Sequence, residues 1–202
     1  MQKSLGPELF ISKLGHPTFL KRLADCNNKA QPFRKAFGKL SSEDLIVDCT
    51  SGFGQDLLCL ASWGAPTIGV ERDSKVFAWL SEAIQLLAKT RPQIKKISSN
   101  LKLLNLNATE ALSTLETEPT HIYLDPIYPE KEKSALGKLD LRLLKEHVGE
   151  DLDTSELLEA ALKKASKRVI VKRPLKALEI THQTKPSLSA EGKSTRYDIY
   201  II

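Results

Sequence analysis

The chain has 202 residues, of which 41% are hydrophobic and 27% charged, and this composition excludes a disordered chain. No apolar run approaches the roughly 18 residues of a membrane-spanning helix, and no secretory signal precedes residue 15, so we expect a cytoplasmic protein. The net charge of +5 permits an anionic partner but does not identify one. Three cysteines, an odd number without close spacing, exclude a disulfide scaffold and disfavour a zinc site.

Residues 1–42 are the least regular part of the sequence. Prolines and glycines interrupt short apolar fragments there, so we predict turns, a short strand and a helix near residues 33–40. We treat this segment as a short N-terminal extension without an assigned role, and residues 43–202 as one domain.

From residue 45 onward, strand and helix patterns alternate. Such alternation implies βαβ crossovers and a mostly parallel sheet with helices on both faces, which is a doubly wound, Rossmann-like α/β fold. We expect the C-terminal strand to be antiparallel to the others. The predicted strands are 45–48, 67–70, 101–106, 121–124, 168–171 and 197–202, and the predicted helices are 55–63, 76–88, 108–115, 130–147 and 154–165.

The first predicted strand ends at Asp48, and the loop after it contains Gly52 and Gly54. Ligands of doubly wound folds bind at the carboxyl ends of the strands, and glycines let the backbone approach a ligand closely. Leu57 stands where a dinucleotide fingerprint has its third glycine, which disfavours NAD and FAD. The pattern that remains suits a smaller ligand carrying one carboxylate, although a purely structural turn gives the same pattern.

The second and third strands also end in polar residues. Glu71 lies 19 residues after Gly52, where an acid can accept hydrogen bonds from both hydroxyls of a ribose. Thr109 and Glu110 can reach an adenine amine, but they equally suit the start of a helix. A solvated pair of Glu71 with Arg72 is the alternative for that acid. Together with the glycine loop, these residues favour an adenosine-type ligand.

The fourth strand ends in Asp125 and Pro126, which precede Ile127, Tyr128 and Pro129. The Asp125 carboxylate and a backbone carbonyl near Pro126 can accept hydrogen bonds from the exocyclic amine of a base, and the Tyr128 ring can stack on that base. A turn with a buried tyrosine is the alternative.

Basic residues without an acidic one extend from Lys163 to Lys176, a pattern that a solvated face also produces. Lys172 and Arg173 end a strand beside the expected base pocket, so we predict that they contact nucleic-acid phosphates. Lys131 and Lys133 follow the Asp125 loop and are predicted to do the same.

These motifs resemble those of class I S-adenosylmethionine-dependent methyltransferases that modify amino groups. The segment 48–54 resembles motif I, Glu71 the ribose-binding acid, and 125–128 the D/N-P-P-Y/F motif. More narrowly, the chain is similar to the RsmJ family, which methylates the N2 amine of a guanosine in small-subunit (16S) ribosomal RNA. The ordered segments that carry this resemblance are 48–56, 71–72, 123–129, 131–136, 148–153, 167–174 and 196–200.

The resemblance implies a methyltransferase domain at 43–202 that uses S-adenosylmethionine, releases S-adenosylhomocysteine and needs no metal. Its expected partner is small-subunit ribosomal RNA or the 30S subunit, with no membrane and no obligate protein partner. The family usually has arginine where this chain has Gln55. The implied catalytic residues are Asp125, Pro126 and Tyr128; the implied cofactor-binding residues are Asp48, Gly52, Gly54, Gln55, Asp56, Glu71, Arg72, Thr109, Glu110 and Asp125.

Other functions remain open at this stage. The same chemistry can serve an amino-group methyltransferase that acts on DNA, another RNA or a small molecule. A non-catalytic module that binds S-adenosylmethionine or RNA is a second alternative, although the glycines and Asp125 that such a module would lose are present. A nicotinamide oxidoreductase is the alternative at the level of the fold, and Leu57 argues against it.

Overall fold

The computed structural model describes the chain except for residues 1–4, 127–138, 149–153, 178–179 and 181. The described residues form a seven-stranded sheet in the order β3-β2-β1-β4-β5-β7-β6. The strands are β1 (Ile46–Asp48), β2 (Thr67–Val70), β3 (Leu101–Leu104), β4 (His121–Leu124), β5 (Arg168–Pro174), β6 (Leu188–Glu191) and β7 (Thr195–Ile201).

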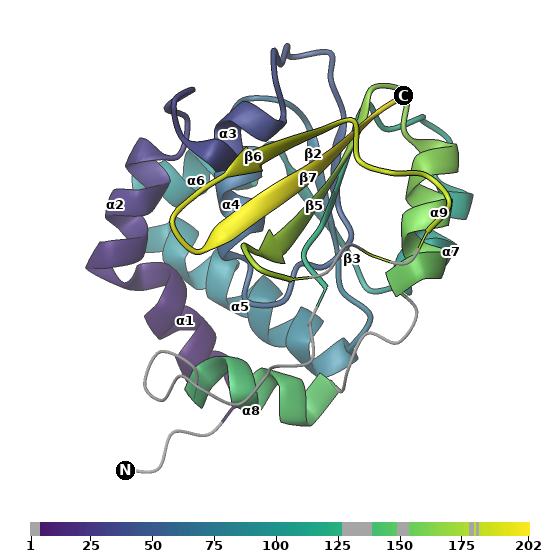
Figure 1. Ribbon diagram of the computed structural model, residues 1–202. Helices are drawn as coiled ribbons and strands as arrows, with labels where there is room; N and C mark the ends of the chain where they lie inside the picture. Colours follow the sequence, from purple (N-terminus) through teal and green to yellow (C-terminus); the bar gives the residue numbers. More distant parts are fainter. Residues whose placement is uncertain (1–4, 127–138, 149–153, 178–179, 181) are drawn as a thin grey trace.

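Helices cover both faces of the sheet, and one further helix lies beyond the ends of the strands (Figure 1). One face packs against the N-terminal helices together with α4, α5 and α6, and the other packs against α7 and α9. The helix α8 lies at the carboxyl ends of the parallel strands. The helices are α1 (Pro7–Gly15), α2 (Pro17–Asp25), α3 (Pro32–Ala36), α4 (Gln55–Ala61), α5 (Ser74–Thr90), α6 (Pro92–Ser98), α7 (Ala108–Thr114), α8 (Leu139–Val148) and α9 (Thr154–Lys164).

The strand order reverses at β1, which pairs in parallel with both β2 and β4. Crossovers run in one direction from β1 to β3 and in the other from β4 to β5, so the loops after β1 and β4 diverge and leave a crevice between them. The strand β7 is antiparallel to β5, and β6 is antiparallel to β7. These pairings confirm the predicted doubly wound fold with an antiparallel C-terminal strand.

The described part of the N-terminal segment forms three helices and no strand, so the predicted short strand is wrong. The helix predicted near residues 33–40 corresponds to α3, whereas α1 and α2 were not predicted. Pro7, Pro17 and Pro32 stand in the first turns of these helices, where the fixed φ of proline suits the helix and its missing N–H is not needed. The prolines that we read as turn residues therefore begin helices. The sequence analysis also missed the helix α6 and the edge strand β6.

The N-terminal helices belong to the main core. Phe10 of α1 is fully buried, and its ring contacts Phe53 of the loop after β1 and Trp79 of α5, with centroids 4.8 and 5.9 Å apart. The helix α1 packs along α5.

Among the described residues, none of the helices combines the length and apolar composition needed to cross a membrane.

Replacing Phe10 by alanine should lower the free energy of unfolding by about 3–5 kcal/mol, because the buried ring would leave a cavity between α1, α5 and the loop. Urea-induced unfolding followed by circular dichroism measures the change. The Phe10→Leu variant keeps most of the apolar volume and should lose much less stability. A loss of less than about 1 kcal/mol in Phe10→Ala would contradict the place of α1 in the core.

Candidate functional site

A cavity of about 360 Å³ opens where the strand order reverses. Its walls come from the loop after β1, the ends of β2, β4 and β5, the start of α7, and α8. The volume lies within the range of small-molecule sites in proteins, and the position is the one that doubly wound folds use for ligands.

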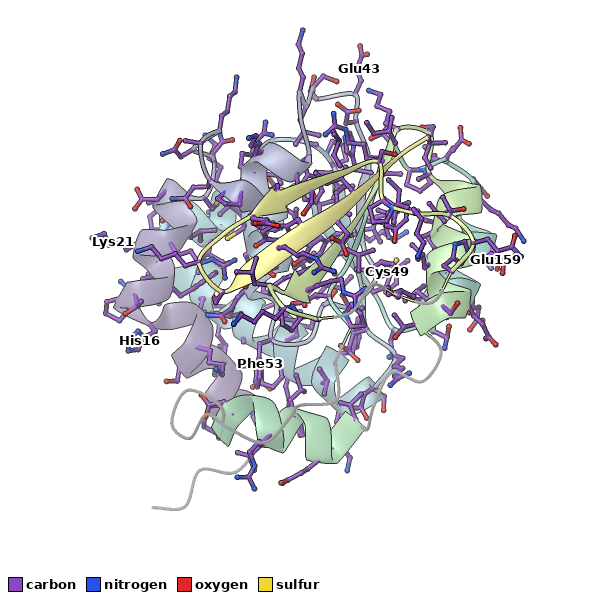
Figure 2. The ribbon with its side chains drawn as sticks, in the orientation of Figure 1. His16, Lys21, Glu43, Cys49, Phe53 and Glu159 are labelled. Atoms are coloured by element: carbon purple, nitrogen blue, oxygen red, sulfur yellow. The ribbon has the colours of Figure 1, made fainter. Side chains whose placement is uncertain are left out.

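The loop after β1 turns sharply because two of its glycines adopt positive φ. Gly52 has φ +47° and Gly54 has φ +76°. A Cβ atom on Gly54 would collide with the side chain of Leu80 in α5, so this position requires glycine for space as well as for conformation. Phe53 between them extends from the loop toward α1 (Figure 2), where its ring contacts Phe10. The glycines thus expose the backbone to the cavity while Phe53 anchors the loop.

Glu71 follows β2 and contacts this loop directly at the cavity wall. Its Oε2 accepts a hydrogen bond from the Gly52 amide, and its Oε1 accepts one from the Asp73 amide, each at 3.0 Å. The Asn105 side-chain amide donates to the Glu71 carbonyl at 2.8 Å. Burial raises the pKa of Glu71, and the two backbone amides oppose this rise. The carboxylate is therefore held in a fixed position at the cavity wall.

Thr50 connects two acids of the site. The Asp125 amide donates to the Thr50 hydroxyl oxygen at 2.7 Å, and the Thr50 amide donates to Oδ1 of Asp48 at 3.0 Å. Burial raises the pKa of Asp48 to about 8. Asp48 thus lies beneath the loop and fixes Thr50, which in turn fixes the backbone of Asp125.

A cluster of charged groups lies on the other side of Asp125. The Lys172 ammonium at the end of β5 donates to Oδ2 of Asp56 at 2.8 Å and to Oδ2 of Asp125 at 2.6 Å. Arg22 of α2 forms an ion pair with Oδ1 of Asp56, and the Tyr123 hydroxyl donates to Oδ2 of the same residue at 2.7 Å. Five side chains from five separate elements or loops therefore meet at one point.

The cations of this cluster set the protonation of the two acids. Burial would raise the pKa of Asp56, but Lys172 and Arg22 outweigh it and hold that pKa well below its usual range. Burial raises the pKa of Asp125, with Lys172 opposing the rise and the nearby Asp56 carboxylate adding to it. Despite burial, Asp56 and Asp125 together raise the pKa of Lys172. Lys172 therefore favours the ionised form of both acids, and Arg22 adds to this effect at Asp56.

The comparisons with known proteins agree on one family. The SAM_MT family model, described as "Putative SAM-dependent methyltransferase", matches residues 12–202. A relative named "Ribosomal RNA small subunit methyltransferase J" from Aeromonas salmonicida is 40% identical over 176 residues, which cover 86% of this chain and 70% of the relative. The chain belongs to the RsmJ family of SAM-dependent methyltransferases.

Several RsmJ-family proteins are longer than this chain. The relative of that name from Pseudomonas paraeruginosa is 44% identical over 156 residues, which cover 77% of this chain and 59% of the relative. The chain therefore spans about three fifths of the length of the first curated relatives that it matches.

Solved structures share the fold. A SAM-dependent methyltransferase from Neisseria gonorrhoeae superposes with a TM-score of 0.66 and 27% identity, covering 85% of this chain and 70% of that one. An RNA methyltransferase from Salinibacter ruber, solved with S-adenosyl-L-homocysteine, superposes with a TM-score of 0.52 at 12% identity and covers 84% of this chain and 89% of that one.

The cavity where the strand order reverses, which we call the RsmJ-family cavity, brings together most of the site residues that the sequence indicated. Asp48 lies beneath it, the exposed Glu110 is not among its lining residues, and Pro126 is buried beside it. Tyr128, Lys131 and Lys133 lie outside the described residues. The predicted residues that line the cavity are Gly52, Gly54, Gln55, Asp56, Glu71, Arg72, Thr109, Asp125 and Lys172.

Lys172 and Arg173, which we predicted to contact phosphates, lie next to carboxylates of the protein instead. Lys172 points into the cavity, where it pairs with two carboxylates. Arg173 is only 4% exposed, and its Nε lies 3.8 Å from a carboxylate oxygen of Asp198 on β7. The end of β5 does lie on the cavity side, as predicted, but its basic side chains face protein acids.

Among the residues that line this cavity, the sequence analysis missed Lys13, Arg22 and Tyr123. Lys13 and Arg22 come from α1 and α2, and Tyr123 comes from the interior of β4. Lys13 forms an ion pair with Asp140 of α8 at 3.0 Å. No local pattern marks these basic residues, because their partners lie far away in the sequence. Tyr123 could have been noticed, since side chains alternate along a strand and it lies two residues before Asp125.

Proposed function

We propose that this chain transfers a methyl group from S-adenosylmethionine to the N2 amine of a guanosine in 16S ribosomal RNA. It would act in the cytoplasm on ribosomal RNA or on the 30S subunit. The observation that carries the proposal is that Asp125, Glu71 and the glycine loop line one cavity where the strand order reverses. The name of the relatives, ribosomal RNA small subunit methyltransferase, supports ribosomal RNA over DNA or a small molecule.

The residues of the cavity fit S-adenosylmethionine. The glycine loop leaves room for a ligand beside its backbone, and Glu71 presents a buried carboxylate suited to ribose hydroxyls. The buried Ser51 hydroxyl of the loop has no hydrogen-bond partner among the described residues, so it is a polar atom suited to a ligand. We assign Thr109 to the adenine end, because it lines the cavity at the start of α7. When bound, S-adenosylmethionine supplies a methyl group attached to a positively charged sulfur.

Asp125 is the residue that we assign to the target amine. Its side chain is 33% exposed, so a base can reach it from the cavity. Lys172 occupies Oδ2, and we assign Oδ1 to accept an N–H of the guanine amine, with a carbonyl of the Pro126 loop as a second acceptor. The nitrogen lone pair of this amine is delocalised into the ring, so hydrogen bonds that orient the amine promote methyl transfer by positioning. Tyr128 is proposed to stack on the base.

Lys172 is proposed to keep Asp125 ionised. Without it, two acids would share a buried site, and one of them would take up a proton. A protonated Asp125 would lose part of its capacity to accept hydrogen bonds from the amine. The structure thus favours a role for Lys172 at the amine. Lys131 and Lys133 keep their proposed contacts with RNA, whereas Arg173 loses its own, because its side chain is buried against Asp198.

The proposed function is tested by mixing the protein, tritiated S-adenosylmethionine and either a 16S rRNA transcript or 30S subunits. Label should appear in the N2 position of a guanosine. Asp125→Asn should lower kcat by about 100-fold or more, because the neutral amide accepts the hydrogen bond of the guanine amine less strongly than the carboxylate does. Cofactor affinity should stay within about threefold. Absence of label with the wild-type protein on both substrates would refute the proposed function, and full turnover by Asp125→Asn would refute the role of Asp125.

The Glu71→Gln variant should bind S-adenosylmethionine about 10-fold or more weakly, because hydrogen bonds to a charged acceptor are worth more than those to an amide. Isothermal titration calorimetry measures the affinity. Glu110→Gln is the matched control, since this exposed acid lies outside the cavity lining, and it should bind normally. Equal affinities of the two variants would show that Glu71 does not hold the ribose.

The Lys172→Met variant should have a pH profile displaced toward higher pH. Loss of the ammonium raises the pKa of Asp125 further, so less of its carboxylate is present at neutral pH and more returns as the pH rises. The ratio of the variant's kcat to that of the wild type should therefore increase between about pH 6 and pH 9. Lys172→Arg preserves the charge and should keep the wild-type profile. A constant ratio for Lys172→Met would contradict this role.

A further inference from the structure

A second cavity of about 430 Å³ adjoins the first. It lies between α2, the start of α3 and the turn that joins β6 to β7, and Figure 1 shows this turn projecting toward α2. We call it the α2–hairpin groove. Arg22 lines both cavities, so the groove and the RsmJ-family cavity meet at this side chain.

The floor of the α2–hairpin groove is aromatic and continues into the charged cluster. Phe33 and Tyr197 are both buried, and their rings stack with centroids 5.3 Å apart. Phe33 also contacts Tyr123, with centroids 5.4 Å apart, and Tyr123 donates its hydroxyl proton to Asp56. Tyr197 pairs with Lys172 in the register of β5 and β7. The groove therefore leads toward Asp125 rather than to a separate part of the surface.

The charged residues that line the α2–hairpin groove are mainly basic. Lys21 and Arg22 project from α2, and Lys193 comes from the opposing turn, whereas Asp25 is the acidic residue of its lining. Lys21 lies at the edge of the molecule in Figure 2, and both lysines are exposed. Two exposed lysines that line one groove suit a polyanion, because each can neutralise a phosphate and release counterions.

We propose that the α2–hairpin groove binds a nucleotide that flanks the target guanosine in a single-stranded segment of the RNA. This inference rests on the proposed function and adds a binding site to it. A base that reaches Asp125 must leave its stack, so the neighbouring nucleotides must follow the surface beside the cavity. Lys21 and Lys193 contact the phosphates of this segment, Arg22 marks the boundary with the amine site, and the aromatic floor lies beneath the flanking nucleotide.

The test compares two doubly charge-reversed proteins. Lys21→Glu with Lys193→Glu alters the groove, and Lys95→Glu with Lys96→Glu is the matched control, because these exposed lysines of α6 line neither cavity. The groove variant should raise KM for the 16S rRNA transcript by about 10-fold or more, with kcat and S-adenosylmethionine affinity within about twofold of wild type. The slope of log KM against log salt should become shallower by about one to two units.

A second measurement does not depend on turnover. Fluorescence anisotropy of a labelled single-stranded oligoribonucleotide, carrying the sequence around the modified guanosine, reports binding in the presence of S-adenosylhomocysteine. The groove variant should bind it about 10-fold more weakly than the control variant does. Far-UV circular dichroism and thermal unfolding establish that both variants are folded.

The outcomes separate this inference from the proposed function. If the wild-type protein methylates neither transcript nor subunit, the proposed function fails. If it methylates RNA but the groove and control variants behave alike, the groove does not bind the strand and the inference is overturned. Loss of activity on 30S subunits with full activity on the naked transcript would assign the groove to a ribosomal protein, which also overturns it.

Discussion

The ion pairs of Lys172 with Asp56 and Asp125 are the interaction on which the site depends. Two carboxylates so close together repel one another and need a cation between them. Lys172 supplies it from β5, and Arg22 adds a second positive charge from α2. The ion pairs therefore bind the end of the sheet, the start of α4 and the N-terminal helices into one unit. Removing one partner of an ion pair leaves the charge of the other uncompensated. All of these segments must therefore be in place together.

The sheet order explains why these segments meet. Because β1 is central and its neighbours β2 and β4 lead in opposite directions, the loops after β1 and β4 face a common crevice. Thr50 bridges the two loops by accepting from the Asp125 amide. The glycine loop and Glu71 form the half of the cavity that suits the cofactor, and Asp125 with Lys172 forms the half that suits an amine. The proposed cofactor half and the proposed amine half thus come from the ends of neighbouring strands.

Apart from α6, the elements from β1 to β4 could be predicted closely because their signals are local. The buried parallel strand β1 appears in the sequence as the continuous apolar run 45–47, and Asp73 caps α5 through the amides of Lys75 and Val76. The N-terminal helices could not be predicted in the same way, since proline indicates a turn as readily as a first helical turn. The environment of Lys172 was also beyond a local pattern, because it is set by Asp56, which lies 116 residues away in the chain. Strand ends identified the acids, but only the folded chain shows which cations they hold.

The contact between Phe10 and Phe53 has a consequence for how this protein can be divided. A proteolytic cut between α3 and β1 would fall between two parts of the chain that share aromatic packing and the ion pair of Arg22 with Asp56. Without the N-terminal part, the main core would lose the side chains that cover one face of the sheet. The helices α1, α2 and α3 therefore support the glycine loop from below and are an integral part of the fold. A shortened protein that started at residue 43 would expose Phe53 and Trp79 to water and leave Asp56 with one cation instead of two.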